Sequence, residues 1–281
     1  MPTSIENSKY KKIIRTLTWR KNLLKVITFL FTLIIFVFMF PIKIALPFGD
    51  GALIDFDGLP IWIALPLLIA CYFLEVVLFY KTVSPALTKP LTEECDPEKY
   101  LELNLDISGT RELTLVCSSA YLFLGEFDKS ISYSKEAAAD RSYRYALTGL
   151  YNKAMAELLI GNTDAVKKTA RAFNDILNGT DKIPEKDRLT FKSMTSLLDL
   201  AVAISDNNAD KIAEIKSTIN LENAGKQRSA TVLARYVVGL SDMVVGDKDS
   251  AQAHFEWLKE NAKKTVFPSL ADKRLKELNR R

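Results

Sequence analysis

The sequence predicts an all-α protein in which an N-terminal two-helix transmembrane hairpin is followed by a helical-repeat solenoid. Two apolar runs, residues 23–46 and 59–80, predict the hairpin, because each is long enough to cross a hydrocarbon core of about 30 Å as a helix. The chain after residue 96 predicts the solenoid, because apolar helical segments alternate there with tight polar turns and period-two alternation of β-branched residues is absent.

The first apolar run is interpreted as a permanent anchor. Its charges are Lys25 and Lys43, one near each end. A cleavable signal peptide has an apolar region of roughly 7–15 residues followed by a small-residue cleavage site, and neither feature is present. We therefore expect residues 23–46 and 59–80 to remain in the membrane as transmembrane helices 1 and 2.

Charge predicts the orientation of the hairpin. Residues 1–25 hold seven basic residues and one acidic residue, most of them in a basic arm at residues 1–22, and Lys81 and Lys89 follow the second span. The loop at residues 47–58 holds three Asp and no Lys or Arg. Basic residues flank the cytoplasmic ends of membrane spans, so we expect a two-span plasma-membrane protein with both termini in the cytoplasm. The arm could also contact anionic lipid headgroups.

Glu75 is the one charged residue of the second span, and it lies near the cytoplasmic end. An intramembrane carboxylate is a candidate functional group. Two structural alternatives stay open: the side chain reaches the interface, or it pairs with Lys25 at the same depth of the first span.

The rest of the chain offers little chemistry. Residues 93–281 carry 28 basic and 29 acidic residues, which argues against a nucleic-acid-binding surface. The cysteines are Cys71, Cys95 and Cys117, the histidine is His254, and these four residues lack metal-ligand spacing. We therefore predict no catalytic site, no metal site and no cofactor.

A linker at residues 81–95 is expected to lead into a cytoplasmic helical domain at residues 96–281. Asp96 is a good helix N-cap, and Pro97 suits the first helical position. Four segments then share the pattern of an apolar helix, a polar turn and an amphipathic helix. Their turn residues are Gly125, Gly161, Asn208 and Gly246, which lie 36, 47 and 38 residues apart. The following first helical turns carry Asp128, Asp164, Asp210 and Asp249.

Residues 111–262 resemble a tetratricopeptide-repeat array. The residues that carry the resemblance are Ser118, Tyr121, Gly125, Phe127, Ser130 and Ala137 in the first unit, Ala154 and Gly161 in the second, Ala201 and Ala213 in the third, and Gly239, Gly246, Ala251 and Phe255 in the fourth. The spacing exceeds the family's repeat of about 34 residues, and the family's Trp and Pro positions are missing, so a generic α-solenoid is the alternative. The charged segment at 269–281 would cap the array. The architecture alone favours a bacterial origin.

Solenoids bind partners on the face formed by the first helix of each pair. Counting from the turns places an apolar groove on that face, suited to an amphipathic helix or an apolar peptide of a protein partner. Its predicted residues are Phe123, Tyr151, Met155, Leu158, Tyr236, Leu240 and Met243. With the register shifted by one or two, the same residues would be ordinary core.

The sequence therefore favours a membrane-anchored scaffold that recruits a partner protein. A peptide-sensing regulator and an accessory subunit of a transporter or cell-envelope complex are the alternatives.

Overall fold

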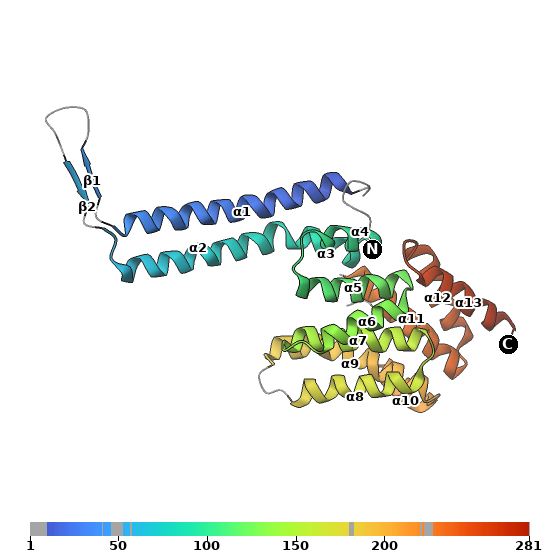
Figure 1. Ribbon diagram of the computed structural model, residues 1–281. Coiled ribbons are helices and arrows are strands. Elements are labelled where there is room, and N and C mark those ends of the chain that lie inside the picture. Colours follow the sequence, from blue (N-terminus) through green and yellow to red (C-terminus); the bar gives the residue numbers. More distant parts are fainter. Residues whose placement is uncertain are drawn as a thin grey trace. The chain divides into compact units, whose positions relative to one another are not determined.

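The computed structural model describes residues 10–40, 42–45, 53–56, 58–179, 183–219, 221 and 227–280 (Figure 1). The chain divides into two compact units, Met1–Leu87 and Thr88–Arg281. Residues 1–9 of the predicted basic arm and residues 47–52 and 57 of the predicted loop lie outside the described residues.

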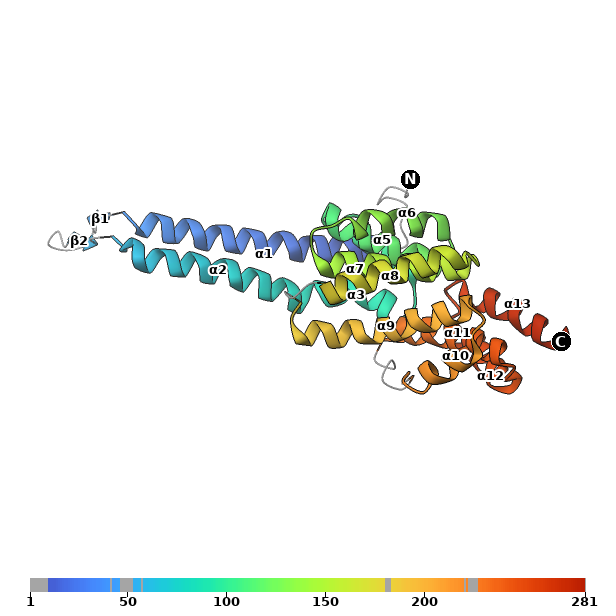
Figure 2. The same cartoon turned by 90° about the horizontal axis from the view of Figure 1, so that it is seen from below.

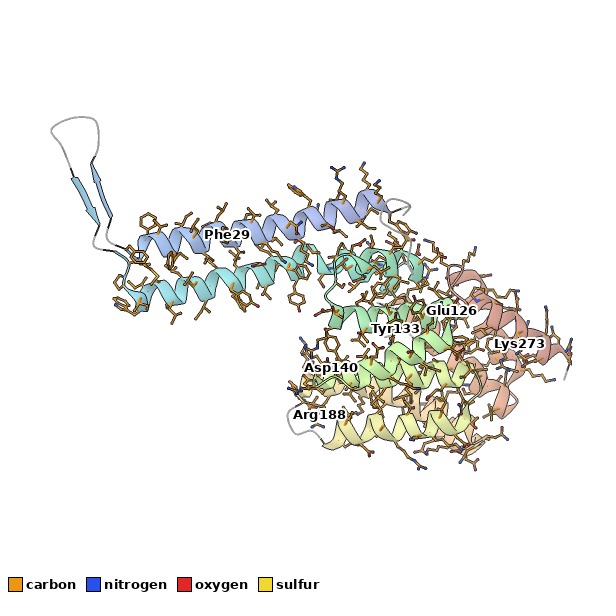
Figure 3. All side chains as sticks on the ribbon, viewed as in Figure 1. Phe29, Glu126, Tyr133, Asp140, Arg188 and Lys273 are labelled. Carbon is orange, nitrogen blue, oxygen red and sulfur yellow. The ribbon has the colours of Figure 1, made fainter. Side chains whose placement is uncertain are left out.

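The first unit contains two long apolar helices that lie side by side, α1 (Lys11–Phe38) and α2 (Ile61–Thr82) (Figures 1 and 2). At 1.5 Å per residue, their 28 and 22 residues give lengths of about 42 and 33 Å. Both are long and apolar enough to cross a membrane. Their large side chains point outward, as Phe29 does in Figure 3.

Helix α1 does not coincide with the predicted first span at residues 23–46. Helix α1 begins at Lys11, because good helix formers run from there without Gly or Pro. It ends at Phe38 instead of residue 46. The sequence has proline at position 41, which lacks an N–H group and disfavours helix in the preceding residue.

A short antiparallel hairpin follows, formed by β1 (Ile42–Ala45) and β2 (Leu53–Phe56), with Lys43 opposite Asp55. These strands are an exception to the predicted all-α class, which holds for the rest of the described chain. They also move Lys43 out of the apolar span.

The predicted linker at residues 81–95 contains a helix, α3 (Ser84–Thr92). Helix α4 (Pro97–Leu105) follows, and the Asp96 side chain accepts a hydrogen bond of 3.0 Å from the Lys99 backbone N–H, so the predicted N-cap is confirmed. The remaining helices are α5 (Thr110–Leu124), α6 (Phe127–Ala138), α7 (Tyr143–Leu159), α8 (Thr163–Gly179), α9 (Glu185–Ser205), α10 (Ala209–Lys216), α11 (Arg228–Val245), α12 (Lys248–Asn261) and α13 (Phe267–Arg280).

Four helix pairs of the second unit are joined by the same turn. A left-handed residue ends the first helix of each pair, and the next residue's N–H bonds to the carbonyl five positions earlier. These bonds are Glu126 to Tyr121 (3.0 Å), Asn162 to Glu157 (2.9 Å), Asn208 to Ala203 (3.0 Å) and Asp247 to Asp242 (2.9 Å). This is the bonding of a Schellman motif, which satisfies carbonyls that the helix leaves free.

The third turn corrects the predicted position by one residue. Asn207, with φ of 51°, takes the left-handed conformation that Gly125, Gly161 and Gly246 take elsewhere. Asn208 is instead the N-cap of α10, and its side chain accepts from the Lys211 N–H. Asparagine tolerates both conformations, so sequence spacing alone does not separate them.

The pairs pack in chain order. Each helix from α5 to α10 contacts the next, as do α11, α12 and α13, and the odd-numbered helices α5, α7, α9, α11 and α13 contact one another in succession. Their apolar faces form one continuous core within the second unit.

Helices α6 and α7 approach closely at Gly149. A Cβ atom at this position would lie 2.8 Å from the Ala138 N, 2.9 Å from the Ala137 Cβ and 2.9 Å from the Ser134 O. Two of these three neighbours are backbone atoms, so the helices would have to separate to admit even a methyl group.

We predict that Gly149→Ala lowers the free energy of unfolding by about 1–3 kcal/mol, the usual cost of overpacking. Denaturation of the full chain in mild detergent, followed by circular dichroism, measures it. Gly179→Ala is the matched control, because nothing lies within 4 Å of its Cβ position. Equal stability of the two variants would contradict the close approach.

Candidate functional site

The residues predicted to form an apolar groove are mostly core. Phe123, Tyr151, Met155, Tyr236 and Leu240 are buried, and Leu158 and Met243 are partly buried. These side chains lie on the inner side of the helices, where they are covered, as in the alternative that they are ordinary core. Their role in binding a partner stays a prediction.

At two of these residues, Phe123 and Tyr236, the cover is the start of the chain's own last helix. Phe267 of α13 is fully buried, and its ring centroid lies 5.4 Å from that of Phe123 and 5.4 Å from that of Tyr236, both with the rings edge-on. The Val266 N–H also donates a 2.9 Å hydrogen bond to the Phe123 carbonyl. Two predicted groove residues, from the first and fourth helix pairs, thus hold one aromatic side chain between them.

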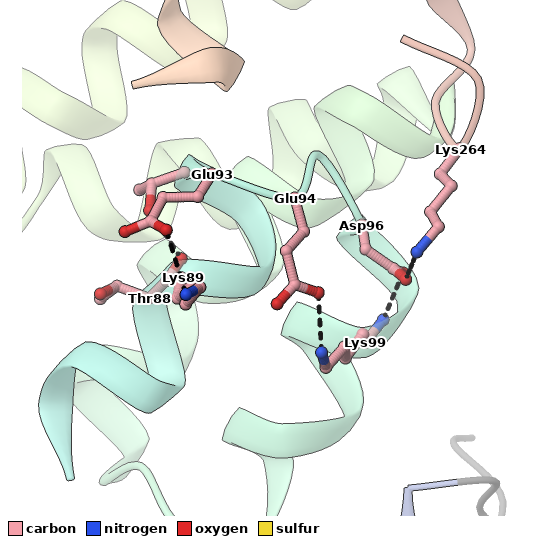
Figure 4. A network of polar contacts seen from close by, with 8 residues as sticks. Thr88, Lys89, Glu93, Glu94, Asp96, Lys99 and Lys264 are labelled. Carbon is pink, nitrogen blue, oxygen red and sulfur yellow. Dashed lines mark hydrogen bonds and ion pairs between the residues drawn. The ribbon is translucent and has the colours of Figure 1, made fainter. Parts of the chain in front are cut away.

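A buried carboxylate fixes the same segment to the start of the second unit. Lys264, in the loop before α13, donates a 2.6 Å hydrogen bond to Asp96, whose side chain is almost fully buried (Figure 4). The same carboxylate caps α4, so one aspartate joins residues 168 positions apart in sequence. A polar contact therefore holds the loop before α13, and apolar contacts hold the start of α13 itself.

The sequence contains a signal for this contact that repeat counting misses. Residues 269–281 are predicted as a charged cap, yet apolar residues recur at helical spacing from position 267 onwards. These residues are Phe267, Leu270, Ala271, Leu275 and Leu278, and each is buried or packs against the core. This spacing predicts an amphipathic helix with a partner surface.

A second cluster surrounds Asp242 of α11, whose side chain is fully buried. Ser250 of α12 donates a 2.6 Å hydrogen bond to its Oδ2, and Lys216 at the end of α10 forms an ion pair with its Oδ1. His254 Nε2 lies 3.7 Å from the same Oδ2. Three helices thus meet at one carboxylate.

Helix α7 carries an equivalent carboxylate. Glu157 lies four residues before Gly161, as Asp242 lies four before Gly246. Thr169 of α8 donates a 2.7 Å hydrogen bond to Glu157, and Lys153 completes the pair at 3.1 Å. The second and fourth helix pairs therefore use one repeat position to bind a hydroxyl group of the following helix.

These groups position helices and lack an activated nucleophile. The Ser250 hydroxyl donates to Asp242 instead of the imidazole, so His254 cannot act as its base in this arrangement. Burial raises the pKa of the Cys95 and Cys117 thiols to about 11, which disfavours thiolate. Among the described residues, no group of three or more His, Cys, Asp or Glu side chains could hold a metal ion.

Glu75 and Lys25 are not brought together. Glu75 on α2 is partly buried and Lys25 on α1 is exposed. No ion pair joins them within the part of the chain that the structure describes. Of the predicted alternatives for Glu75, pairing with Lys25 is not found.

Comparison of the chain with protein-family models, curated proteins and solved structures gave no match.

We predict that Phe267→Ala lowers the free energy of unfolding by about 3–5 kcal/mol, because truncating a buried Phe leaves a cavity. Chemical denaturation of the full chain in detergent measures this loss. Lys273→Ala on the exposed side of α13 is the control, expected to change stability by less than about 0.5 kcal/mol (Figure 3). A loss below about 1 kcal/mol for Phe267→Ala would show that the inner face does not depend on this ring.

Stability should fall on mild acidification because of His254. Desolvation is the main cause that lowers its pKa below 6.5, assisted by Arg235 and Lys216 and opposed by Asp242 and Asp247. The unfolded chain therefore binds the proton more readily than the folded chain. The contribution of neutral His254 to stability is fully present above about pH 6.5 and is lost as the pH falls towards the lower folded pKa.

Melting temperatures of the wild-type chain and of His254→Gln between about pH 7.5 and 5.5 test this dependence. The wild-type melting temperature should drop more steeply than that of the variant. Parallel curves would contradict a depressed histidine pKa.

Proposed function

We propose that this protein is a membrane-anchored scaffold whose second unit recruits a partner protein in the cytoplasm. One observation carries the proposal. Among the described residues, all large exposed apolar side chains except Ile160, Leu189 and Val245 belong to the first unit. Such a surface suits lipid, whereas the second unit buries its apolar residues in its own core and suits water.

Charge supports an orientation with both termini in the cytoplasm. The described part of the predicted arm is helical and displays Lys11, Lys12, Arg15 and Arg20 as exposed side chains. Because α1 ends at Phe38, Lys43 joins the opposite end of the hairpin, which then holds three Asp and one Lys. The positive-inside rule still favours the plasma-membrane topology expected from the sequence.

The repeated turn supports a tetratricopeptide-like solenoid for the second unit. Four helix pairs with the same Schellman bonding, and odd-numbered helices in successive contact, are what a stack of helical hairpins requires. Arrays of this kind serve widely as protein-binding surfaces. Because the predicted groove residues are buried or packed against the core, the exposed outer surface is the proposed site of recruitment.

A peptide-sensing regulator is the second candidate, and α13 is the observation that favours it. The predicted groove was expected to suit an amphipathic helix, and α13 is an amphipathic helix whose Phe267 packs against two of the groove residues, Phe123 and Tyr236. A partner helix of similar pattern could take its place. The two candidates differ in whether recruitment competes with α13.

Orientation is tested by cysteine labelling in intact cells that make the full chain with its native cysteines replaced by alanine. Ala52→Cys should react with a membrane-impermeant maleimide before permeabilisation, and Arg141→Cys only afterwards. The reverse pattern would overturn the proposed topology.

Recruitment is tested by placing a photo-crosslinking amino acid at Leu189 or Ile160, both exposed on the second unit, in the native cells. We expect one dominant crosslinked protein at either or both positions, identified by mass spectrometry. A synthetic peptide of residues 266–281, added to permeabilised cells, should leave a scaffold's crosslink unchanged and should abolish a sensor's. Failure at these and other exposed positions of the second unit would overturn recruitment.

A further inference from the structure

Arg235 of α11 is a half-buried cation without a carboxylate partner among the described residues. Its guanidinium lies over the ring of Trp257, 4.5 Å from the centroid. Nη1 lies 3.3 Å from His254 Nδ1, and the Nε atom is buried with no hydrogen-bond partner. The Trp257 ring thus supports a guanidinium whose N–H groups make few hydrogen bonds.

The nearby carboxylates are already occupied. Asp242 accepts from Lys216 and Ser250. The Asp247 side chain accepts a 3.1 Å hydrogen bond from the Ser250 N–H and caps α12. Desolvation lowers the pKa of Arg235, as expected for a cation that burial penalises and no anion compensates.

His254 does not compensate the positive charge of Arg235. Arginine has only donors, so the contact with Arg235 requires an unprotonated Nδ1. The remaining proton is then on Nε2, which faces Asp242 at 3.7 Å. The imidazole is neutral in this arrangement, and the cationic edge of Arg235 stays uncompensated.

We propose that Arg235, supported by Trp257, binds the carboxylate of an acidic side chain on a partner protein. A guanidinium fork matches a carboxylate in a bidentate geometry, and stacking on an aromatic ring fixes its orientation. Binding would compensate the charge of the guanidinium. The inference deepens the proposed scaffold function, on which it rests, by assigning the chemistry of the recruited group.

The chain carries its own reporters of this site. His254 is the one histidine of the sequence, and Trp257 is the one tryptophan outside the first unit, the others being Trp19 and Trp62. A carboxylate bound to Arg235 would add negative charge near the imidazole and raise its pKa. The NMR signal of the single histidine therefore reports occupancy of the site.

The test uses the full chain in detergent, free of any histidine tag and labelled with ¹³C-histidine. The probes are acetyl-Glu-Glu-Leu-amide, the matched neutral peptide acetyl-Gln-Gln-Leu-amide, sodium acetate and sodium phosphate. We expect a saturable shift of the His254 signal with the acidic peptide, a weaker saturable shift with acetate, and none with the neutral peptide.

Substitution assigns the effect to one residue. Arg235→Gln should weaken binding of the acidic peptide by about tenfold or more, because a charge-assisted pair is lost. Arg141→Gln removes an equal charge from an exposed loop residue and should bind like wild type. Arg235→Lys keeps the charge without the fork and should bind with intermediate affinity, which keeps the test available if Arg235→Gln does not fold.

Three results would overturn the proposal. They are no saturable shift with the acidic peptide, equal affinity of Arg235→Gln and Arg141→Gln for that peptide, or tighter binding of phosphate than of the peptide. The last would assign the site to a phosphate group. None of them would affect the labelling and crosslinking tests of the scaffold function, so the two failures are distinguishable.

Discussion

The fold of the second unit depends on the burial of Phe267 between Phe123 and Tyr236. A stack of helical hairpins leaves one helical face unpaired along its inner side, and aromatic and aliphatic side chains there would otherwise meet water. The apolar edge of helix α13 removes that exposure at Phe123 of α5 and Tyr236 of α11. The Asp96–Lys264 contact holds the preceding loop against the first helices. The inner side chains of the other helices belong to the same continuous core.

The two units differ in the amount of apolar surface that they expose. Helices α1 and α2 expose large apolar side chains along their length. Exposure of that extent is unfavourable in water and neutral in lipid, where helices satisfy their own backbone hydrogen bonds. The second unit has the opposite surface, with its apolar residues buried and its charges balanced. One chain therefore combines two helices long and apolar enough to cross a membrane with a unit that buries most of its large apolar side chains in its own core.

Much of this organisation could be read from the sequence, because it depends on local signals. Uninterrupted apolar runs predicted α1 and α2, and Gly125, Gly161 and Gly246 predicted three of the four turns that the structure has. One error arose because a single residue type serves two roles: Asn207 and Asn208 are both suited to a turn. Another arose because α1 ends at Phe38, shortly before the proline at position 41, whereas the apolar run continues to residue 46. The cover over Phe123 could not be predicted from repeat counting, because it depends on a contact with Phe267, which is far away in sequence.

The buried carboxylates Glu157 and Asp242 lie at the same repeat position but have different cations around them. Glu157 is neutralised by Lys153 of its own helix and bound by Thr169, so the second helix pair is complete in itself. Asp242 takes its cation, Lys216, from the preceding pair, and its own helix adds a second cation, Arg235. A cluster with an extra half-buried cation costs stability unless an anion offsets it. The fourth pair therefore differs from the second by one half-buried cation that has no carboxylate partner among the described residues, while the repeated turn and hydroxyl contact remain the same.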